Sequence, residues 1–175
     1  MLLNISIAVL LLVAALLVIA ATKPNDFTVR RSIRINAPPE KIFPHINDLH
    51  QWAAWSPYEK KDPAMKRTFS GASSGVGAVY EWLGNNQVGS GRMEITEAPV
   101  PSRVTIKLDF FTPFEGHNMA DFTMTPQGGE TEVTWLMRGP SPFIAKLMGI
   151  FINMDKMIGT DFEAGLVNLK AVSEK

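Results

Sequence analysis

The residues best suited to acid–base chemistry or metal binding are few in this sequence, and their spacing does not bring them together. The chain holds three histidines and no cysteine, which excludes disulfides, cysteine-ligated zinc and thiol catalysis. His45 and His50 lie five residues apart, so on a helix they do not share a face as a zinc-binding pair at i and i+4 would. We therefore predict no metal site and no cofactor, and we expect both histidines and His117 to lie at the surface.

The carboxylates offer no better catalytic arrangement. Glu81, Glu94 and Asp121 alternate with apolar residues along expected strands, which turns their side chains toward solvent. A general acid and a general base must instead converge on one substrate. The glycine-rich loop 71–77 lacks the lysine of a phosphate-binding loop. No catalytic residue is predicted, and whether the protein is an enzyme stays open.

The composition bounds the partners of the protein. Seventeen basic and seventeen acidic residues give a formal net charge of zero, which argues against a nucleic-acid partner, because that needs a basic patch. The 175 residues include nine methionines and ten phenylalanines. Flexible thioethers and large rings suit an irregular apolar cavity, and they suit an ordinary core equally well.

The elements that must position these side chains follow from periodicity. Alternating apolar and polar residues predict strands, and the short turns between them imply an antiparallel meander. The expected strands cover residues 27–36, 66–70, 78–83, 88–97, 103–111, 117–125 and 132–138, and a helical stretch over 40–55 is broken near Asp48. An apolar stripe from Leu147 to Val172 predicts one helix of about 30 residues. The fold class is therefore α+β, with a long C-terminal helix laid across a curved antiparallel sheet.

Several segments carry a resemblance to a known family. They are residues 35–43 (INAPPEKIF), 52–57 (WAAWSP), 80–85 (YEWLGN), 89–93 (GSGRM) and 154–166. From Phe27 onward the chain resembles the SRPBCC superfamily, also called START-like or Bet v 1-like, and in particular its bacterial polyketide cyclase/dehydrase and lipid transport group. The resemblance implies a helix-grip fold with a deep cavity between the concave sheet face and the C-terminal helix. It leaves function open, because one fold hosts many functions.

Strand alternation then nominates the residues that line this implied cavity. The predicted ligand-binding side chains are apolar and share the inward faces of strands and helices: Trp55, Tyr80, Trp82, Met93, Ile95, Ile106, Phe110, Phe122, Trp135, Phe151, Met154 and Ile158. Each of them also fits a plain core position. Arg138 is the candidate for binding an anionic head group at the cavity rim; the alternative is that it is a solvent-exposed residue at the end of a strand. Asp155 either enters the cavity or caps the fold.

The N-terminal segment is long and apolar enough to cross a membrane. Leu2 to Ala21 is interrupted only by Asn4 and Ser6, and about 20 apolar residues span a bilayer as a helix. We therefore divide the chain into a transmembrane anchor (1–22), a linker (23–26) and a START-like domain (27–175). Such a short linker keeps the domain, and a mouth of its cavity, close to the lipid.

The side of the membrane follows from charge. All the basic residues near the apolar segment lie after it, beginning with Lys23 and Arg30, and this arrangement favours a cytoplasmic domain on a single-pass inner-membrane protein. The alternative is a signal peptide, whose cleavage would leave a secreted or periplasmic domain. A signal peptide usually has basic residues before its apolar core and a shorter core than this one.

The sequence therefore supports one leading function and two alternatives. The leading hypothesis is a membrane-tethered domain that binds a hydrophobic small molecule or lipid between the sheet and the C-terminal helix. The alternatives are a polyketide cyclase- or dehydrase-like enzyme acting on an apolar substrate, and a ligand-sensing interaction module. An enzyme needs an ionisable group with a shifted pKa in the cavity, whereas a carrier needs none.

Overall fold

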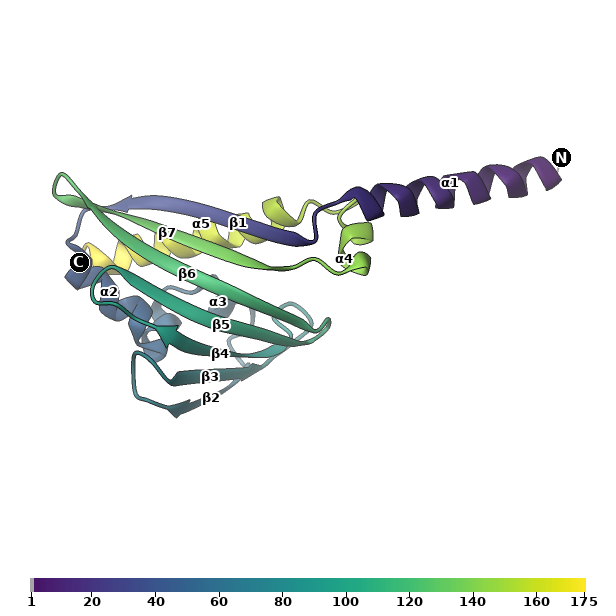
Figure 1. Ribbon diagram of the computed structural model, residues 1–175. Coiled ribbons are helices and arrows are strands. Elements are labelled where there is room, and N and C mark those ends of the chain that lie inside the picture. Colours follow the sequence, from purple (N-terminus) through teal and green to yellow (C-terminus); the bar gives the residue numbers. More distant parts are fainter. Residues whose placement is uncertain (1) are drawn as a thin grey trace.

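The computed structural model describes residues 2–175 and shows a curved sheet that wraps around helices, with one further helix projecting from it (Figure 1). In chain order the elements are α1 (Leu2–Thr22), β1 (Asp26–Ile35), α2 (Pro39–Asn47), the 3-10 helix η1 (Leu49–Ala54), α3 (Pro57–Lys61), β2 (Lys66–Gly71), β3 (Ala78–Leu83), β4 (Ser90–Glu97), β5 (Arg103–Thr112), β6 (Gly116–Gln127), β7 (Glu130–Pro140), α4 (Phe143–Met148) and α5 (Met154–Ser173). The predicted α+β class and all seven predicted strands are confirmed.

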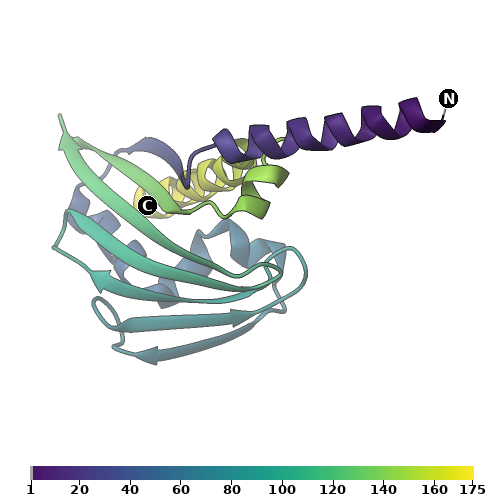
Figure 2. The same ribbon diagram turned by 45° about the vertical axis from the view of Figure 1, so that its right-hand side comes forward.

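The seven strands form one antiparallel sheet in the order β1-β7-β6-β5-β4-β3-β2. The first strand closes onto the last, with Asp26 opposite Pro140 and Ile35 opposite Thr131. Because every neighbour is antiparallel, successive turns alternate between two ends of the sheet. The start of β1, the end of β7 and the turns 84–89 and 113–115 share the end from which α1 leaves, which we call the α1 end (Figures 1 and 2). The turns 72–77, 98–102 and 128–129 form the distal end.

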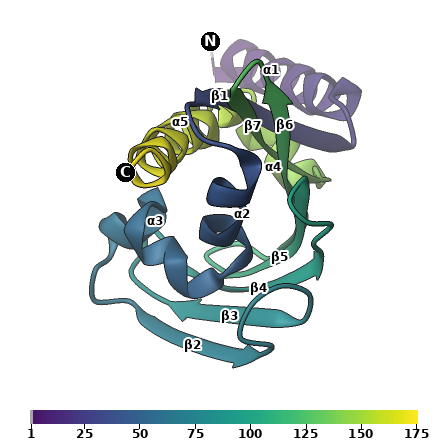
Figure 3. The same cartoon turned by 90° about the vertical axis from the view of Figure 1, so that its left-hand side faces the viewer.

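The helices fill the concave side of the sheet, as a view along the strands shows (Figure 3). Helix α5 packs along β1, while α2, η1 and α3 lie below it, on the open side of the curved sheet. Asp48 caps η1 by accepting a hydrogen bond from the His50 N–H at 2.9 Å, which explains the break predicted there. This arrangement is the helix-grip architecture.

The prediction of one continuous C-terminal helix of about 30 residues is wrong. The chain instead forms the short α4, a loop over residues 149–153 and the 20-residue α5. Gly149 ends α4, where its N–H donates to the Ala145 carbonyl, and Asn153 begins α5 by accepting from the Lys156 N–H at 2.9 Å. An apolar stripe continues across this break, so periodicity alone could not reveal it.

The core centres on five aromatic rings that we call the aromatic cluster: Trp52, Trp55, Phe122, Trp135 and Phe162. The Trp135 ring stacks on Phe162 with centroids 3.9 Å apart. The Trp52 and Trp55 indoles donate to the Ile46 and His45 carbonyls at 3.0 and 2.9 Å. Large buried rings with bonded N–H groups dominate core energetics, so this cluster anchors α2 and η1 to the sheet.

Helix α1 lies apart from this core. Its segment Asn4–Thr22 has a mean hydropathy of 2.9 and is long and apolar enough to span a membrane, a property that a signal sequence shares. Met1, the first residue of the predicted anchor, lies outside the described residues. The other end of the helix is fastened to the domain, because Ala20 is fully buried and α1 contacts α4. The fastening continues past α1, where Lys146 donates to the Asn25 side chain at 2.6 Å.

Candidate functional site

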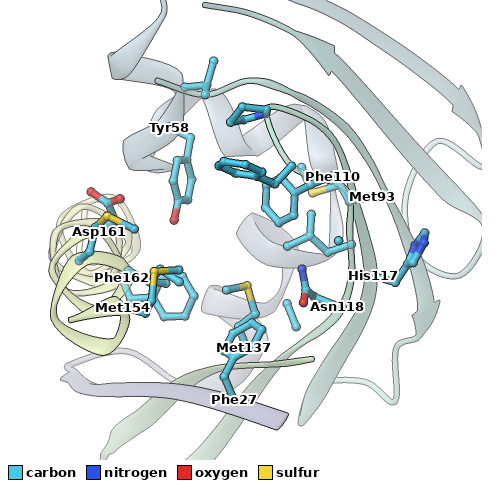
Figure 4. A pocket seen from close by; sticks show the side chains of 18 of the residues that line it. Phe27, Tyr58, Met93, Phe110, His117, Asn118, Met137, Met154, Asp161 and Phe162 are labelled. Atoms are coloured by element: carbon cyan, nitrogen blue, oxygen red, sulfur yellow. The ribbon is translucent and has the colours of Figure 1, made fainter. Parts of the chain in front are cut away.

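A cavity of about 1150 Å³ lies between the concave face of the sheet and helices α3 and α5 (Figure 4). Ligand pockets usually measure about 300–1,000 Å³, so this one has room for a large molecule. Three members of the aromatic cluster, Trp52, Trp135 and Phe162, line its inner end. At the other end the lining reaches Phe114 in the β5–β6 turn and Ile144 in α4, both of which are exposed. The cavity therefore runs from the aromatic cluster to the α1 end.

Strand alternation explains why the walls are apolar. Side chains two residues apart point to the same face of a sheet, and on β5 this row is Ile106, Leu108 and Phe110. Methionines come from several elements and make up much of the remaining wall: Met65, Met93, Met137, Met148, Met154 and Met157. Unbranched thioether side chains repack easily around ligands of irregular shape.

The structure brings eight of the twelve predicted ligand-binding residues to the cavity and leaves four outside it. The eight are Tyr80, Trp82, Met93, Ile106, Phe110, Trp135, Met154 and Ile158. Trp55, at the end of η1, and Ile95 and Phe122, on β4 and β6, instead lie fully buried outside the cavity lining. For the two strand residues, alternation identifies the inward face of the sheet but not the depth of a position. Phe151 is 72% exposed on the loop between α4 and α5, because the helix that would have turned it inward is interrupted there.

Neither predicted polar rim residue faces the cavity. Arg138 lies exposed on the outer face of β7, where its Nε is 3.5 Å from the Asp121 carboxylate. Asp155 pairs with Arg31 at 3.0 Å, and a hydrogen bond from that guanidinium lowers the pKa of Asp155. Arg31 also binds Glu163 at 2.7 Å, so it links β1 to the first turns of α5. Of the two roles considered for Asp155, the structure supports holding the fold together.

No histidine ring enters the cavity interior, although His117 belongs to the residues that line the cavity. His50 is exposed, as predicted, and His45 is only half-buried, with a pKa lowered by burial. His117 projects from the opposite side of the sheet (Figure 4), where its Nδ1 is 2.7 Å from Asp109 Oδ1. The hydrogen bond with Asp109 raises the pKa of His117. For Asp109 burial opposes ionisation, but the hydrogen bonds from His117 and Lys107 outweigh it and lower the pKa.

A buried carboxylate that sequence reasoning missed lies at the cavity wall. Glu59, on α3, is 9% exposed; it accepts a hydrogen bond from the Tyr80 hydroxyl at 2.7 Å and another from Arg67 Nε at 2.7 Å. Burial raises the pKa of Tyr80, and the bond to Glu59 raises it further. Both carboxylate oxygens of Glu59 are therefore engaged, and this group, the Glu59 cluster, clamps α3 onto β2 and β3.

A second charged pair borders the cavity between α3 and α5. Lys61 Nζ lies 2.6 Å from Asp161 Oδ2 and 5.4 Å from the centroid of the Tyr58 ring. The Tyr58 hydroxyl points into the cavity on the side of Asp161 (Figure 4). Burial raises the pKa of Tyr58, and the charge of Asp161 adds to that rise. Tyr58 is therefore a protonated hydroxyl at neutral pH and can donate a hydrogen bond into the cavity.

Two neutral polar groups in the lining have no protein partner. Asn118 is 8% exposed on β6, and its side-chain amide lies on the cavity side of the sheet (Figure 4) without a hydrogen bond to any of the described residues. The Trp135 Nε1 is buried and also unpaired among those residues. The Asn118 amide is therefore open to the cavity and able to hydrogen-bond a molecule there, whereas the Trp135 Nε1 is enclosed by the protein.

This arrangement suits binding better than acid–base catalysis. The acidic groups inside the wall, Glu59 and Asp161, are each paired with a cation. Within the described part of the chain, no three histidine or acidic side chains gather closely enough to hold a metal ion. The groups available to a ligand then include two neutral ones without a partner among the described residues, the Asn118 amide and the Tyr58 hydroxyl, set in an apolar wall.

Two of these polar residues had a visible signal in the sequence. Ser56-Pro57-Tyr58-Glu59 has the S-x-x-E spacing of a capping box with proline at the first helical position, which predicts a short helix there. Asn118 occupies an inward position two residues before Ala120 in the alternation of β6. Asp161 had no such signal, because its contact with Lys61 joins residues 100 positions apart.

Comparisons with known proteins agree with this architecture. Residues 26–174 match the family model described as "Polyketide cyclase / dehydrase and lipid transport". No curated protein sequence matches the chain. Among solved structures, protein CV1439 from Chromobacterium violaceum is 18% identical with a TM-score of 0.62, and the match covers 87% of this chain and 99% of that one.

Two further structures show how widely the fold is shared. The di-domain ARO/CYC protein BexL from the BE-7585A biosynthetic pathway is 14% identical with a TM-score of 0.62, and the match covers 90% of this chain and 53% of that one. The Aha1 dimer from Colwellia psychrerythraea is 16% identical with a TM-score of 0.56, covering 85% and 96%. At these identities the likeness establishes the fold and leaves the ligand to be argued from the site.

Proposed function

The chain belongs to the polyketide cyclase/dehydrase and lipid transport family, and from this premise we propose that it is a membrane-tethered protein that binds an uncharged apolar ligand in its cavity. The observation that carries the proposal is the contrast between the wall and its polar groups. The wall is apolar and its charges are paired, whereas the Asn118 amide and the Tyr58 hydroxyl are neutral groups without a hydrogen-bond partner among the described residues.

The pairing of charges defines the ligand class. A fatty-acid carboxylate or a phosphate would need a free cation in the wall, because burying an unpaired charge is very unfavourable. The lysine of the wall, Lys61, is already bound to Asp161 at 2.6 Å. A carbonyl or hydroxyl oxygen, by contrast, needs only a hydrogen-bond donor such as Asn118 or Tyr58. We therefore expect a lipid-like molecule with at least one neutral oxygen.

The tether is supported by α1 and by the charges that follow it. Helix α1 has the length and hydropathy of a membrane span, and its side chains are exposed along most of its length. Lys23, Arg30 and Arg34 follow the span, which supports a domain on the cytoplasmic face of an inner membrane. A reporter that works only in the cytoplasm, fused after Lys175, should therefore be active, and an inactive reporter would contradict this orientation.

Mass spectrometry of the full chain, extracted from its native membrane in a mild detergent, tests the ligand. We expect a co-purifying neutral, lipid-like molecule in the native protein. The variant Leu108→Trp should lose this ligand, because it fills the cavity from a half-buried wall position. Val100→Trp, at an exposed turn of the distal end, is the matched control and should keep the ligand. A native protein with an empty cavity, or one filled with an anionic lipid, would contradict the proposal.

The family description also names cyclases and dehydrases, and one feature of the site suits such an enzyme. The protonated hydroxyl of Tyr58, beside Asp161, is a hydrogen-bond donor that can activate a substrate carbonyl. If the protein cyclises or dehydrates a test polyketide, Tyr58→Phe should lower kcat strongly while the cavity still binds the substrate. Turnover that depends on Tyr58 would establish the enzyme in place of the carrier.

A further inference from the structure

Exposed apolar side chains gather at one end of the domain, around the mouth of the cavity. We call this set the apolar rim, and it comprises Phe114, Phe143, Ile144, Phe151, Ile152 and Met157. They come from the β5–β6 turn, α4, the loop after α4 and the first turn of α5. Their exposed fractions range from 41% for Ile152 to 72% for Phe151. Phe114, Ile144 and Met157 also line the cavity, so the rim and the mouth are continuous.

The distal end of the domain lacks a comparable group among the described residues. Val76 and Val100 are exposed there, but each stands alone on its own turn. Single exposed apolar residues are normal on soluble surfaces, whereas a group rimmed by polar residues marks an interaction site. The exposure at the α1 end therefore indicates a surface that is covered in the working protein.

The position of α1 indicates what covers it. The rim lies at the end of the domain from which α1 leaves, next to the base of that helix (Figures 1 and 2). The base cannot swing away freely, because Ala20 is buried, Lys23 donates to the Gly149 carbonyl and Lys146 donates to Asn25. A bilayer that holds α1 would therefore meet the rim as well.

The charges near the rim indicate that apolar contact, not electrostatic attraction, would hold this surface. The amino groups of Lys23 and Lys146 are engaged by Gly149 and Asn25. Glu115 is exposed beside Phe114. Lys156, next to Met157, is exposed and forms no ion pair with another described residue, but a single lysine contributes only about 1 kcal/mol at an anionic surface. Burial of the rings in the boundary between headgroups and acyl chains therefore supplies most of the attraction.

We propose that the apolar rim inserts into the bilayer that holds α1, as a second membrane contact that seats the cavity mouth on the lipid. This inference rests on the tether proposed above. It adds a route: an apolar ligand passes between the acyl chains and the cavity through the mouth, beside Phe114 and Ile144, without crossing water.

The absence of cysteine from the chain makes the test clean, because a single introduced cysteine carries the only nitroxide label. Full-length variants in phosphatidylcholine vesicles would carry the label at Phe114→Cys or Phe151→Cys in the rim, at Val76→Cys or Val100→Cys in the distal end, or at Leu10→Cys in α1. Collisions with oxygen, which concentrates in lipid, and with a water-soluble nickel chelate report the surroundings of each label. We expect lipid at positions 10, 114 and 151, and water at positions 76 and 100.

The outcomes separate this inference from the tether. Position 10 in lipid with positions 114 and 151 in water overturns the rim contact and leaves the tether intact. Position 10 in water overturns both. Spin–spin broadening at 114 and 151 that persists when labelled protein is diluted with unlabelled lipid shows that a second copy covers the rim, which also overturns the proposal. Adding phosphatidylglycerol should change the rim signals little.

A kinetic arm tests the route. In the double variant Phe114→Glu and Phe151→Glu, transfer of a fluorescent neutral lipid from vesicle to cavity should slow about tenfold or more, because charged side chains resist entry into lipid. The control Val76→Glu and Val100→Glu adds the same charge at the distal end and should transfer at the native rate. Unchanged melting of both variants shows that they fold. An equal rate in the two double variants would contradict the lateral route.

Discussion

The two ends of the cavity are built in opposite ways. At the inner end the aromatic cluster is fully packed, and the indoles of Trp52 and Trp55 donate hydrogen bonds to backbone carbonyls. At the mouth the lining is methionine-rich, Phe114 and Ile144 are exposed, and the Asn118 amide has no partner among the described residues. A fold that must be stable and also receive a ligand can assign these two tasks to different ends.

This difference indicates which side chains contribute to the free energy of folding. Packed rings and the bonded indoles of Trp52 and Trp55 stabilise the inner end, where the Trp135 Nε1 is the one indole nitrogen of the aromatic cluster without a partner among the described residues. The unpaired groups at the mouth add little to the stability of the empty protein, where water can bond them, and they are left available for a ligand. Similar substitutions should therefore affect stability differently in the packed core and at the mouth; the first three predictions test this difference, the fourth tests an ion pair outside the cavity, and they run from the largest expected effect to the smallest.

Truncating the aromatic cluster should be the most damaging change. Trp55→Ala removes a fully buried ring and should lower the free energy of unfolding by about 3–5 kcal/mol. Met154→Ala at the mouth removes a side chain that is 38% exposed and should cost about 1 kcal/mol or less. Urea denaturation of both variants in the same detergent measures the difference. Equal losses would mean that the mouth is packed as tightly as the inner end.

The two tyrosines of the wall provide a matched pair. Tyr80→Phe removes the donor to Glu59 and should cost about 1–2 kcal/mol, because a buried carboxylate oxygen loses its partner. Tyr58→Phe removes a hydroxyl that points into the cavity and should leave the stability of the empty protein nearly unchanged. The same urea series measures both. A large loss in Tyr58→Phe would show that this hydroxyl serves the fold and not a ligand.

Two asparagines should respond with opposite signs. Asn118→Leu replaces an amide that has no partner among the described residues with an apolar side chain in an apolar wall, and it should raise the free energy of unfolding of the empty protein by about 1 kcal/mol or less, while weakening ligand binding. Asn168→Leu removes the donor to the Trp55 carbonyl, 3.0 Å away, and should lower stability without affecting the ligand. Thermal melting with and without ligand separates the two effects. If Asn118→Leu destabilises the empty protein, the amide has a structural partner after all.

The smallest expected effect is a pH dependence on the outer face of the α1 end. The pKa of His117 is raised from 6.5, so its bond to Asp109 stabilises the fold below that pH and the contribution is lost as the pH rises through the raised pKa. The pKa of Asp109 is lowered from 3.8, so its contribution is lost as the pH falls below that value. His117→Gln should therefore destabilise most between about pH 4 and 6.5 and little at pH 9. A penalty independent of pH would refute the ion pair.

The sequence predicted the fold well because strand alternation is a local signal. The row Ile106, Leu108 and Phe110 was visible as period 2, and it does line the cavity. Depth was not visible, since Ile95 and Phe122 show the same alternation and lie behind the wall. The apolar periodicity also continues through the break between α4 and α5, so it wrongly predicted that Phe151 lies on a helix and faces the cavity.

The polar part of the site depends on contacts between distant residues. Arg31 binds Asp155 across 124 positions, which removed Asp155 from the candidate site. Lys61 binds Asp161 across 100 positions, which leaves the neutral groups as the free ones. Such pairings follow from how α3, α5 and β1 pack together, and no local pattern in the sequence encodes them.

Because α1 is fastened to the domain, the affinity for the ligand should be compared with the ligand concentration in the membrane and not with its concentration in water. A freely soluble carrier must extract its ligand from water, where an apolar molecule is scarce, and so needs a low dissociation constant. Ala20, Lys146 and Asn25 fasten α1 beside the mouth, so the mouth lies next to the bilayer if α1 spans it as we propose. The relevant quantity becomes the mole fraction of ligand in the bilayer, which is enriched by hydrophobic partitioning. A site that binds weakly in a test tube can then be well occupied, and it can release its ligand as readily as it fills.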